Sequence, residues 1–176
     1  MNVVPDGRVL VVADTSVLLN FAIIGRLHLL TESRYLVHPP NHVIREVRTE
    51  PYKARVSAAI TAQQLIELEI ADRTEIEAYA IYRSRFGDGE SAAMAVAVNR
   101  LWLIAIDEKG PTRREVIARL GEDHLLTTAS ILGTAIADGL ISANDISAIR
   151  DELAANRHLL DHVPGEREEP SSPSRT

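Results

Sequence analysis

The chain contains no cysteine among its 176 residues, which excludes a disulfide framework and any zinc site built on thiolates. Aromatic residues are scarce at 4%, although the hydrophobic share of 45% is ordinary for a globular protein. Leu, Ile, Val and Ala must therefore form the core, as is typical of helices packed on a sheet. No apolar run is long enough to span a membrane, and MNVVPDGRV lacks the pattern of a signal peptide. We expect a soluble, cytoplasmic protein with no membrane partner.

An excess of basic charge is absent as well, because 25 acidic residues outnumber 19 basic ones and the net charge is −6. The chain therefore lacks the strongly basic character of many nucleic-acid-binding domains, but it is compatible with a cluster of metal-binding carboxylates. Its length suits one well-buried domain better than two, and we expect that domain over residues 1–163. The segment 164–176, PGEREEPSSPSRT, is rich in Pro, Ser and charge, and we expect a disordered tail there.

The stretch RVLVVADTSVLLNFAII, at residues 8–24, carries the most informative pattern. Five apolar residues, 9–13, predict a buried strand of a parallel sheet, and the strand ends abruptly at Asp14. Helical spacing follows over 17–24, and Ser16 is a suitable N-cap for that helix. Asp14 would then lie at the carboxyl end of a central strand, where open α/β sheets bind ligands. The alternative is that Asp14 only caps the helix.

Strands and helices alternate along the rest of the chain. Further strands are predicted at 35–37, 101–106 and 125–126, with a short exposed strand or edge at 65–70. Helices are predicted at 42–47 after an Asn41 cap, at 52–63 and 73–84, from Glu90 to Arg100, from Pro111 onward, and at 128–138 and 143–155. This alternation predicts an α/β fold of three layers, α/β/α, with a mainly parallel central sheet.

Four segments resemble successive motifs of PIN-domain nucleases: VVADTSVLLNFA, HPPNHVIREV, GDGESAAMAVA and LIAIDEKGPTRREV. The likeness is closest to the bacterial and archaeal PIN proteins of toxin–antitoxin pairs, the VapC-like group, and runs from about residue 8 to about residue 140. It implies a PIN-like parallel sheet with helices on both faces and a carboxylate cluster at one end. In that family the cluster binds Mg²⁺ or Mn²⁺ and hydrolyses RNA phosphodiester bonds.

The resemblance places the four acids of the family on Asp14, Glu46, Glu90 and Asp107. We expect Asp14 to be the principal metal ligand, Glu90 and Asp107 to be further ligands, and Glu46 to be a ligand or a general base. Carboxylates suit this task because Mg²⁺ takes oxygen ligands and keeps several waters. Each acid also has an ordinary structural role, for example Glu90 in the first turn of a helix. Their agreement with the family order favours a single site.

Neighbouring residues complete the expected site. Thr15 and Ser16 match the small hydroxyl residues that support the first acid. Glu108 is an alternative to Asp107 as the fourth acid, because the residue that closes a strand need not be the one that turns inward. Three basic residues follow closely: Lys109, Arg113 and Arg114. They are candidate contacts to RNA phosphates at the rim of the site, although a solvated helix face is the commoner role.

Other functions stay open at this point. Ala92 stands where the family often carries a second acid, so a catalytically silent PIN-like binding or regulatory module is the alternative to an endoribonuclease toxin. A phosphoaspartate protein using Asp14 is a third interpretation. It fits poorly, because Ser16 occupies the place of a phosphatase's second acid, and no convincing receiver acid pair and lysine are found. The family implies an RNA substrate, an antitoxin protein and a homodimer as partners.

Overall fold

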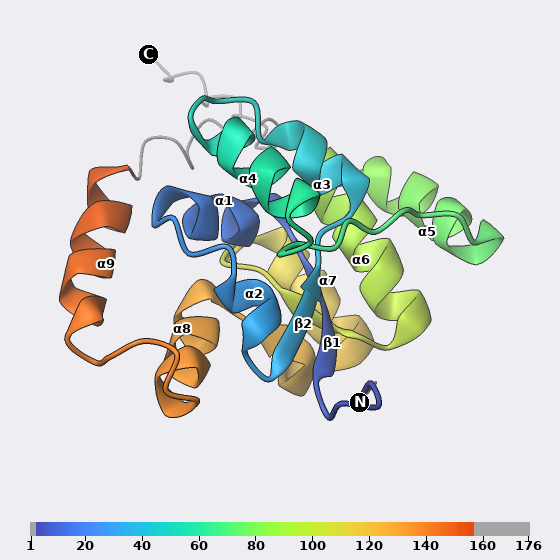
Figure 1. Cartoon of the computed structure of the whole chain (residues 1–176). Helices are drawn as coiled ribbons and strands as arrows, with labels where there is room; N and C mark the ends of the chain where they lie inside the picture. Colours follow the sequence, from blue (N-terminus) through green and yellow to red (C-terminus); the bar gives the residue numbers. More distant parts are fainter. Residues whose placement is uncertain (1–2, 157–176) are drawn as a thin grey trace, which may run out of the picture.

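The computed structural model describes residues 3–156 (Figure 1). The predicted tail at 164–176 and the end of the predicted domain, 157–163, lie outside the described residues. Four strands form one sheet in the order β2–β1–β3–β4, and every neighbouring pair is parallel. The strands are β1 (Val9–Ala13), β2 (Tyr35–His38), β3 (Leu103–Ala105) and β4 (Leu125–Leu126). The parallel sheet predicted from the sequence is therefore confirmed.

Helices connect and cover these strands. They are α1 (Thr15–Ile23), α2 (Leu29–Glu32), α3 (Asn41–Glu46), α4 (Tyr52–Thr61), α5 (Arg73–Arg83), α6 (Asp88–Arg100), α7 (Pro111–Leu120), α8 (Thr128–Ala137) and α9 (Asp145–Ala155), with a 3-10 turn, η1 (Glu122–His124), before β4. Within the described part of the chain, none of these helices is both long and apolar enough to cross a membrane.

Each face of the sheet packs against its own set of helices, because successive strand residues point to opposite sides. Val11 and Ala13 of β1 join a core made with α1 to α4, α8 and α9. Val12 and Ile104 face the other way and pack with α5, α6 and α7. Figure 1 shows α5 and α6 on one side of β1 and β2, and α8 and α9 on the other. The three-layer α/β/α arrangement predicted from the sequence is confirmed.

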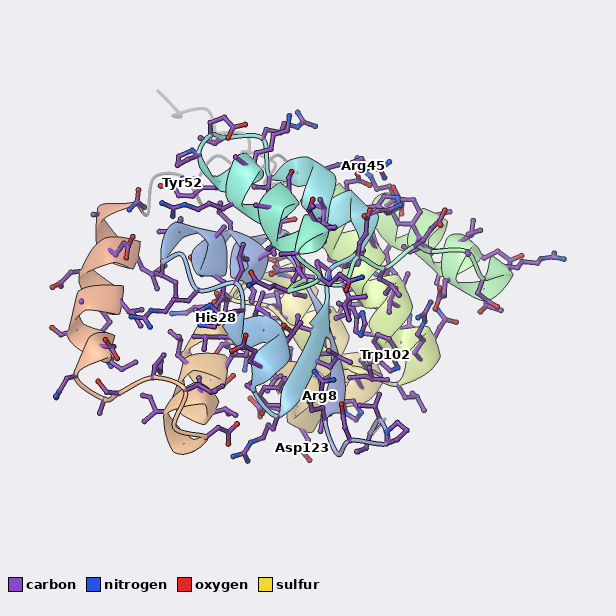
Figure 2. The ribbon with its side chains drawn as sticks, in the orientation of Figure 1. Arg8, His28, Arg45, Tyr52, Trp102 and Asp123 are labelled. Atoms are coloured by element: carbon purple, nitrogen blue, oxygen red, sulfur yellow. The ribbon has the colours of Figure 1, made fainter. Side chains whose placement is uncertain are left out.

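The outermost helix of the first layer, α9, is fastened at its end to α4. The hydroxyl of Tyr52, labelled in Figure 2, donates to the Asn156 side chain over 3.0 Å. Tyr52 is buried, and so is Ile149 in the middle of α9. These contacts hold α9 against the layer that also contains α1.

The start of α1 differs from the prediction. Asp14, not Ser16, is the N-cap, because its carboxylate accepts a hydrogen bond from the Val17 amide over 3.0 Å. Ser16 already lies in the first turn and donates its hydroxyl to Asp14. Asp14 therefore caps α1 and also lies at the carboxyl end of β1, so the two roles considered for it coexist.

Other details of the elements also differ from the prediction, among them the start of α6, which is Asp88 and not Glu90. Pro40, not Asn41, occupies the N-cap position of α3. The segment 65–70 forms one bridge, between Leu68 and Pro40, and no strand. Two consecutive prolines, residues 39 and 40, lack the amide donors that a longer ladder needs. Strand β3 begins at Leu103 because Leu101 ends α6 in a left-handed conformation with φ of 54°.

Candidate functional site

Four acids lie around the carboxyl edge of the sheet. Asp14 directly follows β1 and Asp107 lies two residues after β3, and parallel neighbours end at the same edge. The first turn of α6 carries Glu90, and Glu46 is the last residue of α3. Helices α3 and α6 pack against each other, so their acids approach the strand ends together. The topology thus brings segments more than 90 residues apart in sequence to one edge.

Asp14 is the most deeply buried of these acids, with 3% of its surface exposed. The Ser16 hydroxyl donates to its carboxylate over 2.8 Å, in addition to the capping bond from Val17. Burial raises the pKa of Asp14 to about 8, and the negative charges of Asp107 and Glu90 add to the rise. The hydrogen bonds from Val17 and Ser16 oppose it. In the absence of a cation, the folded protein therefore holds Asp14 mainly protonated at neutral pH.

Asp107 is held by donors from two helices. Its Oδ1 accepts from the Thr128 amide over 2.8 Å, and its Oδ2 accepts from the Thr128 hydroxyl. The amide nitrogen of Asn20, on α1, donates to Oδ2 over 2.7 Å. The backbone amide of Asp107 donates to the Ser16 hydroxyl over 3.4 Å. Ser16 thus connects Asp14 with Asp107.

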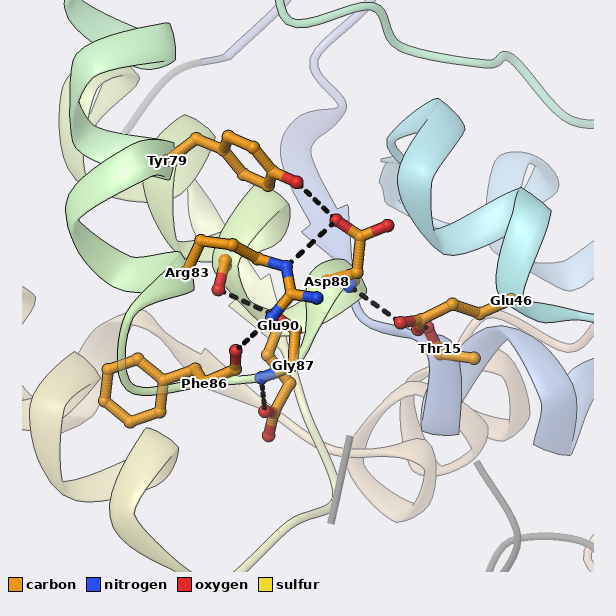
Figure 3. Close-up of polar contacts among 10 residues, drawn as sticks. Thr15, Glu46, Tyr79, Arg83, Phe86, Gly87, Asp88 and Glu90 are labelled. Carbon is orange, nitrogen blue, oxygen red and sulfur yellow. Dashed lines mark hydrogen bonds and ion pairs between the residues drawn. The ribbon is translucent and has the colours of Figure 1, made fainter. Parts of the chain in front are cut away.

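Glu46 is fixed by the first turns of α1 and α6 (Figure 3). The Thr15 hydroxyl donates to its Oε2, and the Gly89 amide donates to its Oε1 over 3.0 Å. Burial raises the pKa of Glu46, the two hydrogen bonds lower it, and the charges of Asp88 and Glu90 raise it further. A Cβ added at Gly89 would press on the Glu46 carboxylate and lie 2.5 Å from the Thr15 hydroxyl oxygen, so these side chains would have to shift.

Glu90 is oriented by two different donors. Its Oε2 accepts from the Gly87 amide over 2.9 Å and its Oε1 accepts from the Thr112 hydroxyl over 2.7 Å. Asp88, two residues earlier, accepts from the Tyr79 hydroxyl and lies 3.6 Å from the Arg83 guanidinium (Figure 3). The N-terminus of α6 therefore presents two acids in different surroundings, one tied to α7 and one tied to α5.

The remaining predicted residues lie in other settings. The Glu108 side chain lies against Gly110, where an added Cβ would be 2.5 Å from Glu108 Oε1. Arg113 forms an ion pair with Glu122 over 3.1 Å, and Lys109 and Arg114 are exposed. Of Asp107 and Glu108, Asp107 is the one whose charge raises the pKa of Asp14.

The donor set suits a hard divalent cation. Carboxylate and hydroxyl oxygens surround the site, and Mg²⁺ and Mn²⁺ prefer such ligands. Asn20 adds a buried amide oxygen that has no hydrogen-bond partner. Over residues 3–156, however, no three His, Asp or Glu side chains are gathered into a ready metal-binding group. The residues present therefore fit the cation by the chemistry of their oxygen donors.

Sequence reasoning missed several supporting residues. Asn20 interrupts the apolar stripe of α1, and a polar residue in such a buried helix is a recognisable signal. Thr128 follows β4 at the same carboxyl edge, so the argument that found Asp14 applies to it. Thr112 and Gly89 gave no distinctive local signal, because their roles depend on contacts with distant acids.

Comparison with known proteins identifies the family. The model of the DUF3368 family, described as a PIN domain, matches residues 10–162, which is most of the chain and includes all four acids. No curated protein and no solved structure matches the sequence. PIN domains are generally nucleases, which agrees with a carboxylate-lined edge. The chain therefore belongs to the PIN-domain family.

Proposed function

We propose that the protein is a metal-dependent endoribonuclease that hydrolyses RNA phosphodiester bonds at the carboxyl edge of its sheet. The observation that carries this proposal is the joint placement of Asp14, Glu90 and Asp107, because the charges of the last two act on the first. Buried carboxylates that repel one another are stabilised by protons or by a cation. Membership in a nuclease family adds support.

Asp14, Glu90 and Asp107 would hold Mg²⁺ or Mn²⁺, which when bound polarises the phosphodiester and lowers the pKa of a water. Asp14 must lose its proton before it can serve as a ligand, so cation binding near neutral pH is coupled to proton release. Ser16 and the Val17 amide keep its carboxylate in place during that change.

Glu46 serves in this proposal as a ligand or as the general base. Its raised pKa brings its proton affinity closer to neutral pH, where a base is most effective. The bonds from Thr15 and Gly89 fix both of its oxygens, so a water placed beside it would meet a carboxylate of defined orientation. Lys109, Arg113 and Arg114 are proposed to contact phosphates of the RNA at the rim.

We further propose that the protein is the toxin component of a toxin–antitoxin pair, on the strength of the motif likeness to that group of PIN proteins. Its partners would be an antitoxin protein and a second copy of the chain. Induced expression should arrest bacterial growth, and the Asp14→Asn variant should not. Light scattering of the purified protein should give the mass of a homodimer.

The direct test of the nuclease is cleavage of labelled RNA and DNA panels with Mg²⁺, Mn²⁺ or EDTA. The Asp14→Asn variant is compared with Asp72→Asn, since Asp72 is likewise a helix N-cap but is exposed, and none of the four acids acts on its pKa. We expect RNA products that form only when a metal is present. These products should be absent with Asp14→Asn and present with Asp72→Asn. Metal-supplied, folded wild-type protein that cuts no RNA would overturn the proposal.

A silent binding or regulatory module is the second candidate. The observation in its favour is that, in the described part of the chain, no three acids or histidines are gathered around one point. Such a module would bind RNA or protein equally well with Asp14 or Asn at position 14. It would also show no metal-dependent products.

A further inference from the structure

Asn20 is an unusual residue for the middle of α1. Its neighbours Leu19 and Phe21 are core residues, and Asn20 itself is only 6% exposed. Its amide nitrogen donates to Asp107 Oδ2 over 2.7 Å and to the Thr128 hydroxyl over 3.2 Å. Its amide oxygen is buried and has no hydrogen-bond partner in the structure. A buried acceptor without a donor is costly, so a folded protein keeps one only where something offsets the cost.

The hydrogen-bond network fixes which way the Asn20 amide points. The Thr128 hydroxyl donates its one proton to Asp107, so toward Asn20 it can only accept. Turning the amide over would set its oxygen against a carboxylate oxygen and an accepting hydroxyl oxygen. That orientation is repulsive, so the nitrogen faces Asp107 and the oxygen is left for another donor.

The same network determines which oxygen of Asp107 is available. Oδ2 already accepts from Asn20 and from the Thr128 hydroxyl, which uses both of its lone-pair directions. Oδ1 accepts only from the Thr128 amide and keeps one direction open. An incoming cation therefore meets Oδ1 without breaking an existing hydrogen bond.

We propose that Asn20 is a positioning residue of the metal site. Its amide nitrogen fixes Asp107 so that Oδ1 is the oxygen offered to a divalent cation, and its orphaned amide oxygen accepts a hydrogen bond from water that accompanies the cation. This inference rests on the cation-binding part of the proposed function and is independent of which nucleic acid is cut. It also assigns the fourth acid to Asp107, because Asn20 and Thr128 orient that carboxylate.

The test is calorimetric titration of MnCl₂ into the full chain, with Mn²⁺ electron paramagnetic resonance as a second readout. We expect Asn20→Ala to weaken Mn²⁺ binding about 10- to 100-fold, the usual effect of removing a group that orients a metal ligand. Asn99→Ala is the matched control, since Asn99 is a helical amide on α6 that bonds only within its own helix. This control should bind Mn²⁺ as the wild type does.

A double variant separates positioning from a general loss of structure. If Asn20 acts mainly through Asp107, Asn20→Ala should weaken Mn²⁺ binding much less in the Asp107→Asn background than in the wild type. Circular dichroism and thermal unfolding in EDTA establish that each variant is folded. Should Asn20→Ala fail to fold, Thr128→Val tests the same arrangement, because it removes the other donor to Oδ2.

The outcomes distinguish the inference from the proposed function. The inference is overturned if folded Asn20→Ala, or Thr128→Val in its place, binds Mn²⁺ as tightly as the wild type does. The proposed function would not be affected by that result. Wild-type protein that binds no Mn²⁺ would overturn the inference and the metal-dependent function together. Weakened binding in Asn20→Ala, with normal binding in Asn99→Ala, supports the inference whatever the RNA assay shows.

Discussion

Replacing Asp14 by Asn should stabilise the metal-free protein at pH 8, although it removes a residue of the site. Asn has nearly the same shape and is an equally good N-cap, so its side-chain oxygen can still accept from the Val17 amide. At pH 8 the main change is the loss of the negative charge, which burial beside Asp107 and Glu90 penalises. We therefore expect a gain in unfolding free energy that depends on pH.

The magnitude follows from the pKa of Asp14, which is raised from 3.8 to about 8. Between these values the folded protein keeps a proton that the unfolded chain has released. The free energy of unfolding of the wild type therefore falls, relative to the variant, by about 1.4 kcal/mol for each pH unit of increase. The stability that protonated Asp14 contributes is fully present below pH 3.8 and is lost as the pH rises to about 8. From pH 5 to pH 8 the difference amounts to on the order of 4 kcal/mol.

Urea denaturation in EDTA at pH 5, 6.5 and 8 measures this difference. Asp72→Asn is the matched control, because Asp72 caps α5 in an exposed position where the Thr74 hydroxyl lowers its pKa. That variant should show no gain at pH 8. If the difference between wild type and Asp14→Asn were the same at all three pH values, Asp14 would not carry a raised pKa and the electrostatic reasoning would be refuted.

Three further substitutions test other parts of the account. Gly89→Ala should displace Glu46, since a Cβ there would press on the Glu46 carboxylate, and should lower RNA cleavage at least tenfold while circular dichroism stays native. Cleavage at the wild-type rate would contradict this. Asp107→Asn should abolish cleavage and Glu108→Gln should preserve it, and the reverse pattern would reassign the fourth acid. Glu75→Ala should lower the urea-derived unfolding free energy by about 2 kcal/mol, because it removes the buried carboxylate that accepts two hydrogen bonds from Arg100. A change near zero would be inconsistent with that ion pair.

The layers and the sheet were predictable because local patterns specify them. The apolar run before Asp14 and the alternation of strands and helices were enough to place β1, β2 and β4 and to predict parallel pairing. The N-cap of α1 was not predictable from the sequence, because Asp14 and Ser16 are both good N-cap residues and stand two residues apart. What separates them is that Asp14 closes the strand and Ser16 already turns with the helix.

The contacts that orient the acids could not be predicted from the sequence, for a different reason. Asn20 meets Asp107 across 87 positions and Thr128 across 108, and no periodicity along one segment reports such a meeting. The choice between Asp107 and Glu108 depends on how the chain turns after β3 ends at Ala105. The family motifs were enough to predict the four acids. The hydrogen-bond donors that orient these acids come from distant parts of the chain and are seen only in the folded structure.

The most direct measurement is an anomalous difference map from crystals of the wild-type protein soaked in MnCl₂. The account predicts a Mn²⁺ peak in contact with Asp14, Glu90 and Asp107 Oδ1, and the loss of that peak in Asp14→Asn crystals. The crystals are soaked at a Mn²⁺ concentration that supports cleavage. A map with no Mn²⁺ peak, or with peaks only at other places, would contradict the claim that these acids form the metal centre.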